Sequence, residues 1–220
     1  MARTVEDVAL MLSVMARPDD RSPISFPADG REFLPAIERP DIRGLTVAWS
    51  PDLGVVPVDQ EVRKIAGAAA RRFAECGCTV EEGEPDFGNV REVIRVTRAL
   101  RMVTLHADKL KKWREKMNPN LVSNIEQGFP LTARQVGEAE MERTAIYHRV
   151  REFFERYDLL LTPTVAVPPF PVEADYPREI NGQPMTSYTD WFLLTYAIPI
   201  TGLPAISIPC GWTAEGFPVG

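Results

Sequence analysis

The sequence predicts an α/β fold, in which part of a mixed, mostly parallel sheet is covered by helices on both faces. Residues 45–49 and 78–82 are two short strand-like runs on either side of an amphipathic helix that begins after Asp59, and a strand–helix–strand unit of this length is typical of parallel pairing. Two long segments, 89–113 and 132–157, carry apolar residues at steps of three and four, so each predicts a helix that packs along one face.

The connections and the first helix follow from local residue patterns. A helix is expected over 4–17, where Thr4 and Asp7 have the spacing of a helix-capping pair. Residues 18–44 are rich in Pro, Asp, Arg and Gly and predict a surface connection. Residues 117–130 are expected to connect the two long helices.

Two further strands are predicted in the last third of the chain. Residues 158–164 form a continuous apolar run, which is typical of a short strand buried on both faces, and residues 205–208 predict a second strand of this kind. Residues 213–216 then turn the chain toward a strand that the sequence does not supply.

Turn and helix signals separate these two strands. Asn181 and Gly182 predict a tight turn, because both residues tolerate left-handed backbone angles. Ser187 and Asp190 have the spacing of a helix-capping pair, which predicts a short helix. That helix must end before Pro199, since the residue before a proline is disfavoured in helical conformation.

Charge and cysteine content exclude some classes of partner. The 220 residues carry a net charge of −6, which argues against nucleic acid as a partner because phosphate binding needs a basic surface. No apolar run approaches the roughly 20 residues of a membrane span, and no signal-peptide pattern opens the chain. Three cysteines at irregular spacing predict no disulfide framework, which suits a reducing, cytoplasmic compartment.

Three segments together resemble the amidase signature family of serine hydrolases. They are M-A-R-T-V-E-D at 1–7, Y-D-L-L-L-T-P-T at 157–164, and T-G-L-P-A-I-S-I-P-C-G at 201–211 followed by G-F-P-V-G at 216–220. The resemblance implies hydrolysis of a carboxylic amide through a seryl acyl-enzyme, made by a Ser–Ser–Lys triad with no metal and no organic cofactor. The order of the segments implies that residues 1–220 are the C-terminal portion of a single amidase signature domain, truncated at both ends.

The chain departs from the family pattern at the residues that do the chemistry. A serine needs a neighbouring base and small residues whose N–H groups reach the developing oxyanion, yet the sequence has no Ser-Ser pair and no Gly-Gly pair. In the family the triad precedes the segment that matches residues 1–7, so no catalytic residue is expected here, and the chain alone is expected to be inactive. Pro199 stands where many relatives carry Asn. None of the five lysines matches the catalytic lysine: Lys64, Lys109, Lys111, Lys112 and Lys116.

An aromatic cluster is the strongest candidate for substrate contact. Trp191, Phe192 and Tyr196 lie in the predicted short helix. They would form an apolar wall for the acyl or amine group of an amide. Aromatic residues at helical spacing also pack in cores, and the sequence favours neither interpretation over the other.

The resemblance adds residues around the proline-rich loop. In the family this loop rims the active-site cleft, so Thr164 and Pro168 are expected to contact substrate, as ligands gather at strand ends in α/β sheets. The P-x-x-P spacing from Pro168 to Pro171 also occurs in ligands of partner proteins, and the rim is the preferred interpretation. Thr201 and Gly202 are expected at a pocket edge, with a strand-entry turn as the alternative.

Other chemically suggestive residues have simpler interpretations. Cys76 and Cys78 lack the second ligand pair of a zinc site, and His106 and His148 sit within helices without a motif partner. The basic run 109–116 fits a solvated helix end better than a nucleic-acid or membrane contact.

Two other classes of function remain open. The alternatives to a segment of an ordinary amidase are a non-catalytic binding or assembly module, and one half of a split amidase whose partner chain, the missing N-terminal half, carries the triad. The partners expected are a small-molecule amide in the complete enzyme and that N-terminal half, with no nucleic acid and no membrane.

Overall fold

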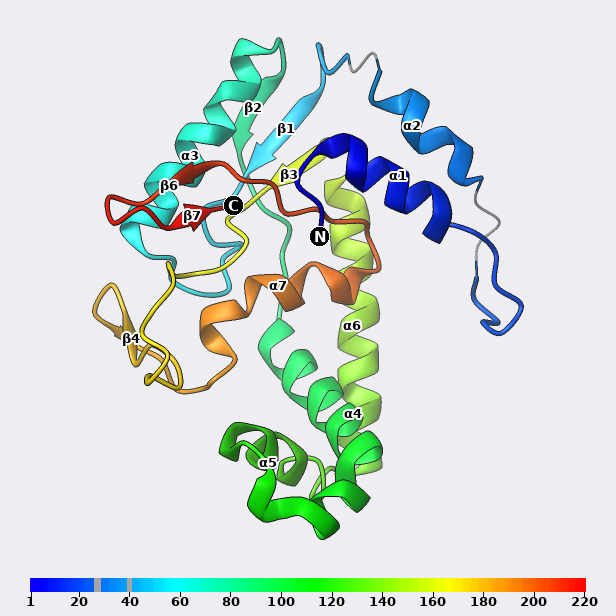
Figure 1. Ribbon diagram of the computed structural model, residues 1–220, viewed down its shortest axis with the longest axis vertical. Helices are drawn as coiled ribbons and strands as arrows, with labels where there is room; N and C mark the ends of the chain where they lie inside the picture. The colour runs from blue at the N-terminus through cyan, green and yellow to red at the C-terminus, as the bar shows by residue number, and fades with distance from the viewer. Residues whose placement is uncertain (26–28, 39–40) are drawn as a thin grey trace. The chain divides into compact units, whose positions relative to one another are not determined.

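The computed structural model describes residues 1–25, 29–38 and 41–220, and divides into two compact units, Met1–Arg43 and Gly44–Gly220 (Figure 1). The predicted α/β class with a parallel sheet is confirmed. Among the described residues, no helix combines the length and the apolar content needed to cross a lipid bilayer. The main helices and strands are α1 Val5–Met15, α2 Phe33–Ala36, β1 Thr46–Trp49, α3 Gln60–Glu75, β2 Thr79–Glu82, α4 Val90–Trp113, α5 Pro119–Glu126, α6 Ala133–Phe153, β3 Leu159–Leu161, β4 Glu179–Ile180, β5 Gln183–Pro184, α7 Leu194–Ala197, β6 Gly211–Trp212 and β7 Pro218–Val219.

The first unit is built on α1. The predicted cap is confirmed, because Thr4 Oγ1 accepts a hydrogen bond from Asp7 N at 3.1 Å. The predicted surface connection 18–44 also contains a short helix, α2, which contacts α1. Gly30 lies against α1 so closely that a Cβ there would stand 2.0 Å from the Ser13 carbonyl oxygen. Residues 26–28 and 39–40 of that connection lie outside the described residues.

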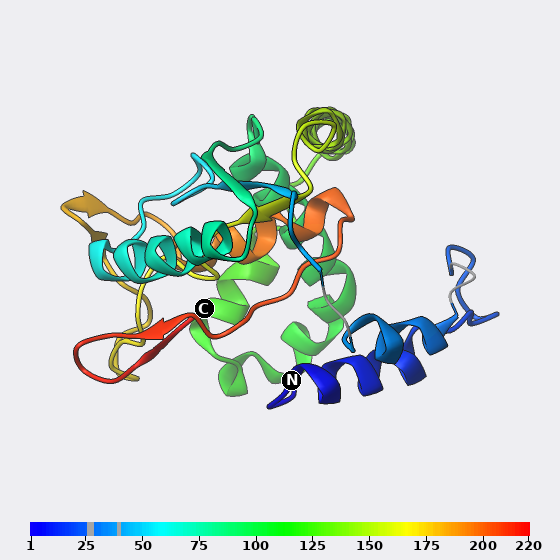
Figure 2. The ribbon, with the colours of Figure 1, turned by 90° about the horizontal axis from the view of Figure 1, so that it is seen from above.

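The second unit is centred on a three-stranded sheet in the order β2-β1-β3, with both pairs parallel. The β1–α3–β2 unit confirms the predicted strand–helix–strand. Asp59 caps α3 by accepting from Glu61 N at 2.9 Å, and Gly77 follows the helix with a φ of 87°. Figure 2 shows α3 between the sheet and the β6–β7 hairpin, and α3 contacts both. The central strand is the most buried, since Val47 and Ala48 are fully shielded from solvent.

The two long predicted helices are α4 and α6, which pack against each other. The predicted capping pair of α6 is present: Thr132 Oγ1 accepts from Gln135 N, and Gln135 Oε1 accepts from Thr132 N. Residues 117–130 connect the two helices as expected, but they also contain a helix that was not predicted, α5. Asn118 caps α5 by accepting from Asn120 N at 2.8 Å, and the proline that follows it suits the first helical position.

The C-terminal part follows the sequence signals in some places and departs from them in others. The strand expected over 158–164 pairs only at β3, and its Leu159 is 37% exposed, so it is not buried on both faces. The tight turn at Asn181 is confirmed and joins the antiparallel strands β4 and β5. The predicted strand 205–208 was wrong: no strand is assigned there, and Ile206 and Ile208 are 66% and 46% exposed.

The end of the chain contains a strand that was not expected. The turn at 213–216 is confirmed, but the strand described as missing is present in short form as β7, which pairs with β6. Gly220 lies beside the segment that follows β3, since Thr164 N donates to the Gly220 carbonyl at 2.9 Å. The hairpin is thereby tied to the segment that follows β3.

Candidate functional site

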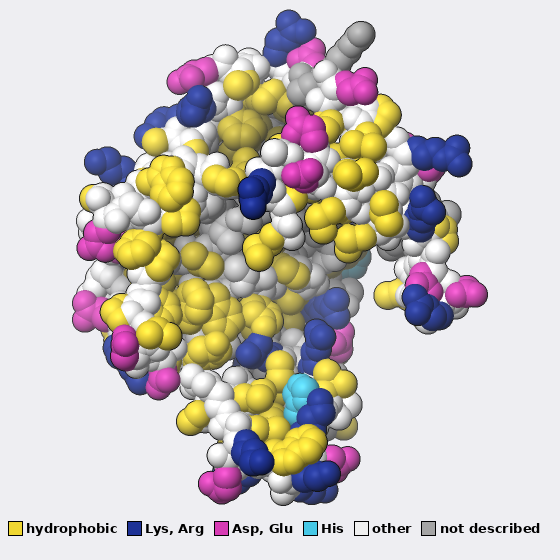
Figure 3. Space-filling model, viewed as in Figure 1, with side chains coloured by type: hydrophobic (Ala, Val, Ile, Leu, Met, Phe, Trp, Pro, Cys, Tyr) yellow, Lys and Arg dark blue, Asp and Glu magenta, His cyan; other side chains and the backbone are white. Residues whose placement is uncertain are grey.

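An apolar cavity of about 370 Å³ lies beside the carboxyl end of β3. Its walls come from the loop after β3, from the turn that carries Trp191, from β7 and from α3. Figure 3 shows hydrophobic side chains gathered on the viewed face over the loop before β4 and the start of α7. The residues that line this cavity, called the apolar pocket below, are Val62, Val165, Val167, Pro168, Pro169, Phe170, Trp191, Pro218, Val219 and Gly220.

Aromatic rings form a continuous row from this pocket along the short helical segment 190–201. Phe170 meets Trp191 edge to face at 5.3 Å between ring centroids, and Trp191 meets Phe192 at 4.9 Å. Phe192 then contacts Tyr196 at 5.5 Å. Trp191 therefore lines the apolar pocket, whereas Phe192 and Tyr196 extend the row away from it.

The indole nitrogen of Trp191 has unsatisfied hydrogen-bonding capacity. Trp191 Nε1 is buried and has no hydrogen-bond partner among the described residues. A buried N–H usually finds an acceptor, because leaving it unpaired costs about 1–3 kcal/mol. The same holds for Thr162 Oγ1, which lies just past β3.

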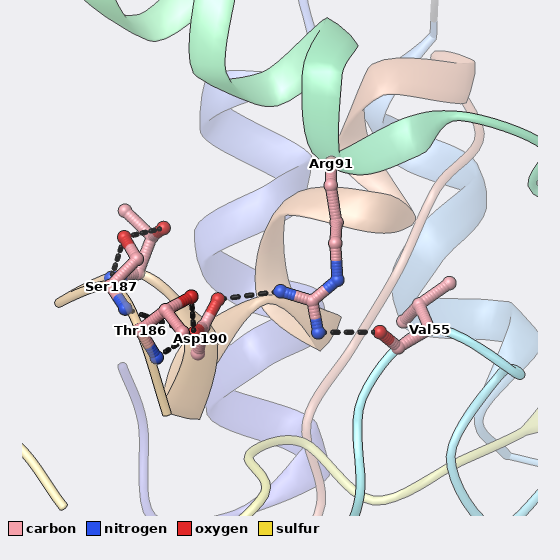
Figure 4. A network of polar contacts seen from close by, with 6 residues as sticks. Val55, Arg91, Thr186, Ser187 and Asp190 are labelled. Carbon is pink, nitrogen blue, oxygen red and sulfur yellow. Dashed lines mark hydrogen bonds and ion pairs between the residues drawn. The ribbon is translucent and has the colours of Figure 1, made fainter. Parts of the chain in front are cut away.

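A buried carboxylate holds the turn that presents Trp191 (Figure 4). Asp190 is 4% exposed and forms an ion pair with Arg91 of α4 at 2.5 Å between Oδ1 and Nη1. Its other oxygen accepts from the backbone N–H groups of Thr186 and Ser187, each at 3.0 Å. The same guanidinium donates to the Val55 carbonyl at 2.8 Å, so this network joins three segments distant in sequence.

Only half of the predicted capping pair is present at this turn, because Asp190 N donates to the Ser187 carbonyl rather than to its hydroxyl. Asp190 accepts from Ser187 N, and the Ser187 hydroxyl accepts from Thr189 N at 3.2 Å. The helical segment consists of a tight turn over Asp190–Phe192, then α7, then a second tight turn over Pro199–Thr201. It ends its α-helical part before Pro199, as expected.

The remaining candidate residues fall in two places. Thr164 lies beside the apolar pocket: its Oγ1 is 2.7 Å from Ser207 Oγ, and its N–H is bonded to Gly220, which lines the pocket. Thr201 and Gly202 end the segment 190–201 near α6. Thr201 is 5% exposed and its hydroxyl donates to the Ile198 carbonyl at 2.6 Å, while Gly202 has a φ of 76°.

A second, polar cavity was not predicted from the sequence. It measures about 220 Å³ and lies between α4, α5 and the residues before Asp190. The signal available in the sequence was a stripe of arginines, Arg91, Arg95 and Arg98, at steps of four and three on one helix. The lining residues are Ile94, Arg95, Arg98, Ala99, Asn120, Ser123, Asn124, Gln127, Tyr176, Thr186, Ser187, Tyr188 and Thr189.

Neither cavity contains the groups of a serine hydrolase. All five lysines are exposed, and in the described part of the chain no lysine is hydrogen-bonded to a serine. The described residues also contain no group of three or more His, Cys, Asp or Glu side chains placed to hold a metal ion. The apolar pocket can bind an apolar group but offers no nucleophile and no base.

Fold and site together define an α/β protein with an apolar pocket at the carboxyl end of a parallel strand. The chain belongs to the amidase family, whose family model matches residues 1–220. It is 34% identical over 223 residues to an acylamidase of Rhodococcus erythropolis, a match that covers 100% of this chain and 46% of that protein. It is 27% identical over 227 residues to an amidase of Pseudomonas putida, a match that covers 99% of this chain and 47% of that protein.

Solved structures agree with this assignment. The crystal structure of a bacterial aryl acylamidase of the amidase signature family superposes with a TM-score of 0.86 at 27% identity, over 100% of this chain and 47% of that one. The chain thus spans about half the length of the relatives that it matches.

Proposed function

We propose that the chain is the C-terminal portion of a single amidase signature domain and that it supplies one wall of the substrate pocket. The observation that carries this proposal is the apolar pocket beside the carboxyl end of β3, where Pro168, Phe170 and Trp191 converge. The order of the three family-like segments along the chain supports the assignment to the C-terminal portion.

The reaction of the complete enzyme is hydrolysis of a small carboxylic amide through a seryl acyl-enzyme. Its nucleophile, base and oxyanion donors lie outside residues 1–220, and the chemistry needs neither a metal nor an organic cofactor. The 34% identical acylamidase and the structurally similar aryl acylamidase favour an amide that carries an apolar aryl or acyl group. The cysteine content favours a cytoplasmic location.

Specific residues have separate roles in this proposal. Trp191 and Pro168 contact the apolar group of the substrate, and Thr164 lies beside the pocket. Phe192 and Tyr196 back Trp191 through ring contacts. Their side chains set the position of its indole. The proposed edge residues Thr201 and Gly202 fix the end of the same segment.

Binding of a small anilide tests the pocket independently of turnover. Equilibrium dialysis of the 220-residue chain against acetanilide should show saturable binding that Trp191→Ala abolishes. Trp113→Ala is the matched control, because Trp113 is 45% exposed at the end of α4 and lines neither cavity. Equal binding by both variants would contradict the assignment of the pocket.

A split arrangement, in which a partner chain carries the triad, is a second candidate. Exposed apolar side chains favour it: Ile206 and Ile208 are largely exposed in an unpaired segment, and Leu159 is 37% exposed on β3. Contiguous apolar surface is often covered by other protein, which here would be the remaining half of the domain on the same chain or on a partner chain. Recovery of anilide hydrolysis on mixing this chain with a separately produced N-terminal half would support the split form over a non-catalytic binding module.

A further inference from the structure

The polar cavity between α4 and α5, called the arginine pocket below, is separate from the apolar pocket. The two cavities share no lining residue. The arginine pocket is lined by Arg98 and Asn124, and also by Ser187, Tyr188 and Thr189. Its volume of about 220 Å³ suits a small molecule rather than a polymer segment.

Arg98 holds its charge in this pocket without a counterion. Its guanidinium lies over the Tyr196 ring at 5.3 Å and over the Phe192 ring at 6.0 Å, which fixes its position. It donates to the Tyr196 hydroxyl and to Asn124 Oδ1, both of which are neutral. In the described part of the chain, no carboxylate lies within ion-pair distance of Arg98.

The neighbouring arginine differs in this respect. Arg95 makes two parallel hydrogen bonds to Glu92, each of 2.6 Å, and this pairing lowers the pKa of the Glu92 carboxyl. Arg95 is therefore neutralised within its own helix. The uncompensated charge at the arginine pocket is that of Arg98.

The other lining groups are mostly neutral hydrogen-bonding side chains. They include the hydroxyls of Ser123, Ser187 and Thr189 and the side-chain amides of Asn120 and Gln127. Such groups satisfy the oxygens of an anion without adding charge. A planar guanidinium matches the two oxygens of a carboxylate, and a single positive charge matches a monoanion.

We propose that the arginine pocket binds a small carboxylate through the Arg98 guanidinium. The carboxylate accepts from the exposed edge of the guanidinium and from the hydroxyls of the segment 186–189. Binding neutralises a half-buried charge that the protein otherwise leaves to solvent and aromatic faces.

Equilibrium dialysis of the 220-residue chain against benzoate, at constant ionic strength set with chloride, tests this site. Saturable binding is expected, weakened about 10-fold or more by Arg98→Met, since a bidentate charged contact is lost. Arg98→Lys should bind with intermediate strength, because it keeps the charge but not the planar fork. Arg101→Met is the matched control, as Arg101 is exposed on the same helix and lines neither cavity.

Three results would overturn the proposal. They are absence of saturable benzoate binding, equal weakening by Arg101→Met, and tighter binding of inorganic phosphate than of benzoate. Far-UV circular dichroism of each variant shows whether the fold is kept. If Arg98→Met unfolds, benzoate binding by Arg98→Lys is compared with binding by the unsubstituted chain, and equal binding by the two would overturn the proposal.

Discussion

Removal of the Asp190 carboxylate should release the turn that presents Trp191. In the structure this carboxylate accepts from Thr186 N and Ser187 N at 3.0 Å each. A hydrogen bond to a charged group contributes about 1.5–3 kcal/mol. Because a factor of ten in an equilibrium corresponds to about 1.4 kcal/mol, Asp190→Ala should accelerate hydrogen exchange of these two amides by roughly 10- to 100-fold. The 10- to 100-fold range does not include the ion pair to Arg91, since the Arg91 side chain is 46% exposed and its charge is screened by water.

Hydrogen exchange followed by mass spectrometry of the peptide 184–192 measures this effect. Asp175→Ala is the control, because Asp175 is 64% exposed and its nearest basic group, on Arg178, is 4.0 Å away. Asp190→Asn should have a smaller effect, since its amide oxygen can still accept from both N–H groups. Unchanged exchange in Asp190→Ala, or equal acceleration in Asp175→Ala, would refute the role given to this carboxylate.

The remaining predictions concern packing and thiol chemistry. Gly128→Ala should destabilise the chain by about 1–3 kcal/mol in urea unfolding, because its Cβ would lie 2.5 Å from a backbone oxygen of α4. Gly137→Ala, in open space on α6, should instead stabilise it by about 0.5–1 kcal/mol, and a reversed order would contradict the packing described. Burial raises the pKa of the Cys210 thiol, so maleimide should label exposed Cys76 first at pH 8, and labelling of Cys210 should accelerate as pH rises toward that pKa. Faster labelling of Cys210 than of Cys76 would count against its burial.

Local signals in the sequence predicted the elements that local chemistry stabilises. The capping residues Thr4, Asp59 and Thr132 each form the expected bond at a helix start. The helix α5 was not predicted, although Asn118 and Pro119 carry a recognisable start signal within the connection between the two longer helices.

Features that depend on distant partners could not be predicted in the same way. The apolar run 205–208 has the composition of a strand, yet a strand forms only where another strand supplies hydrogen bonds, and none is paired with it in the described part of the chain. Likewise, Trp191 and Pro168 were singled out separately, and only the fold brings them to one cavity. The contacts of Arg98 with Tyr196 and Asn124 join residues that are 98 and 26 positions apart, so the arginine stripe on α4 could not by itself indicate the arginine pocket.

We expect this chain to carry part of a substrate pocket but none of the catalytic groups. The most direct test is to measure arylamine release from a small anilide by the purified 220-residue chain alone. No release above the rate without protein is expected, because all five lysines are exposed and no serine–lysine contact is present in the described part of the chain. Turnover that a serine-directed probe abolishes would contradict it.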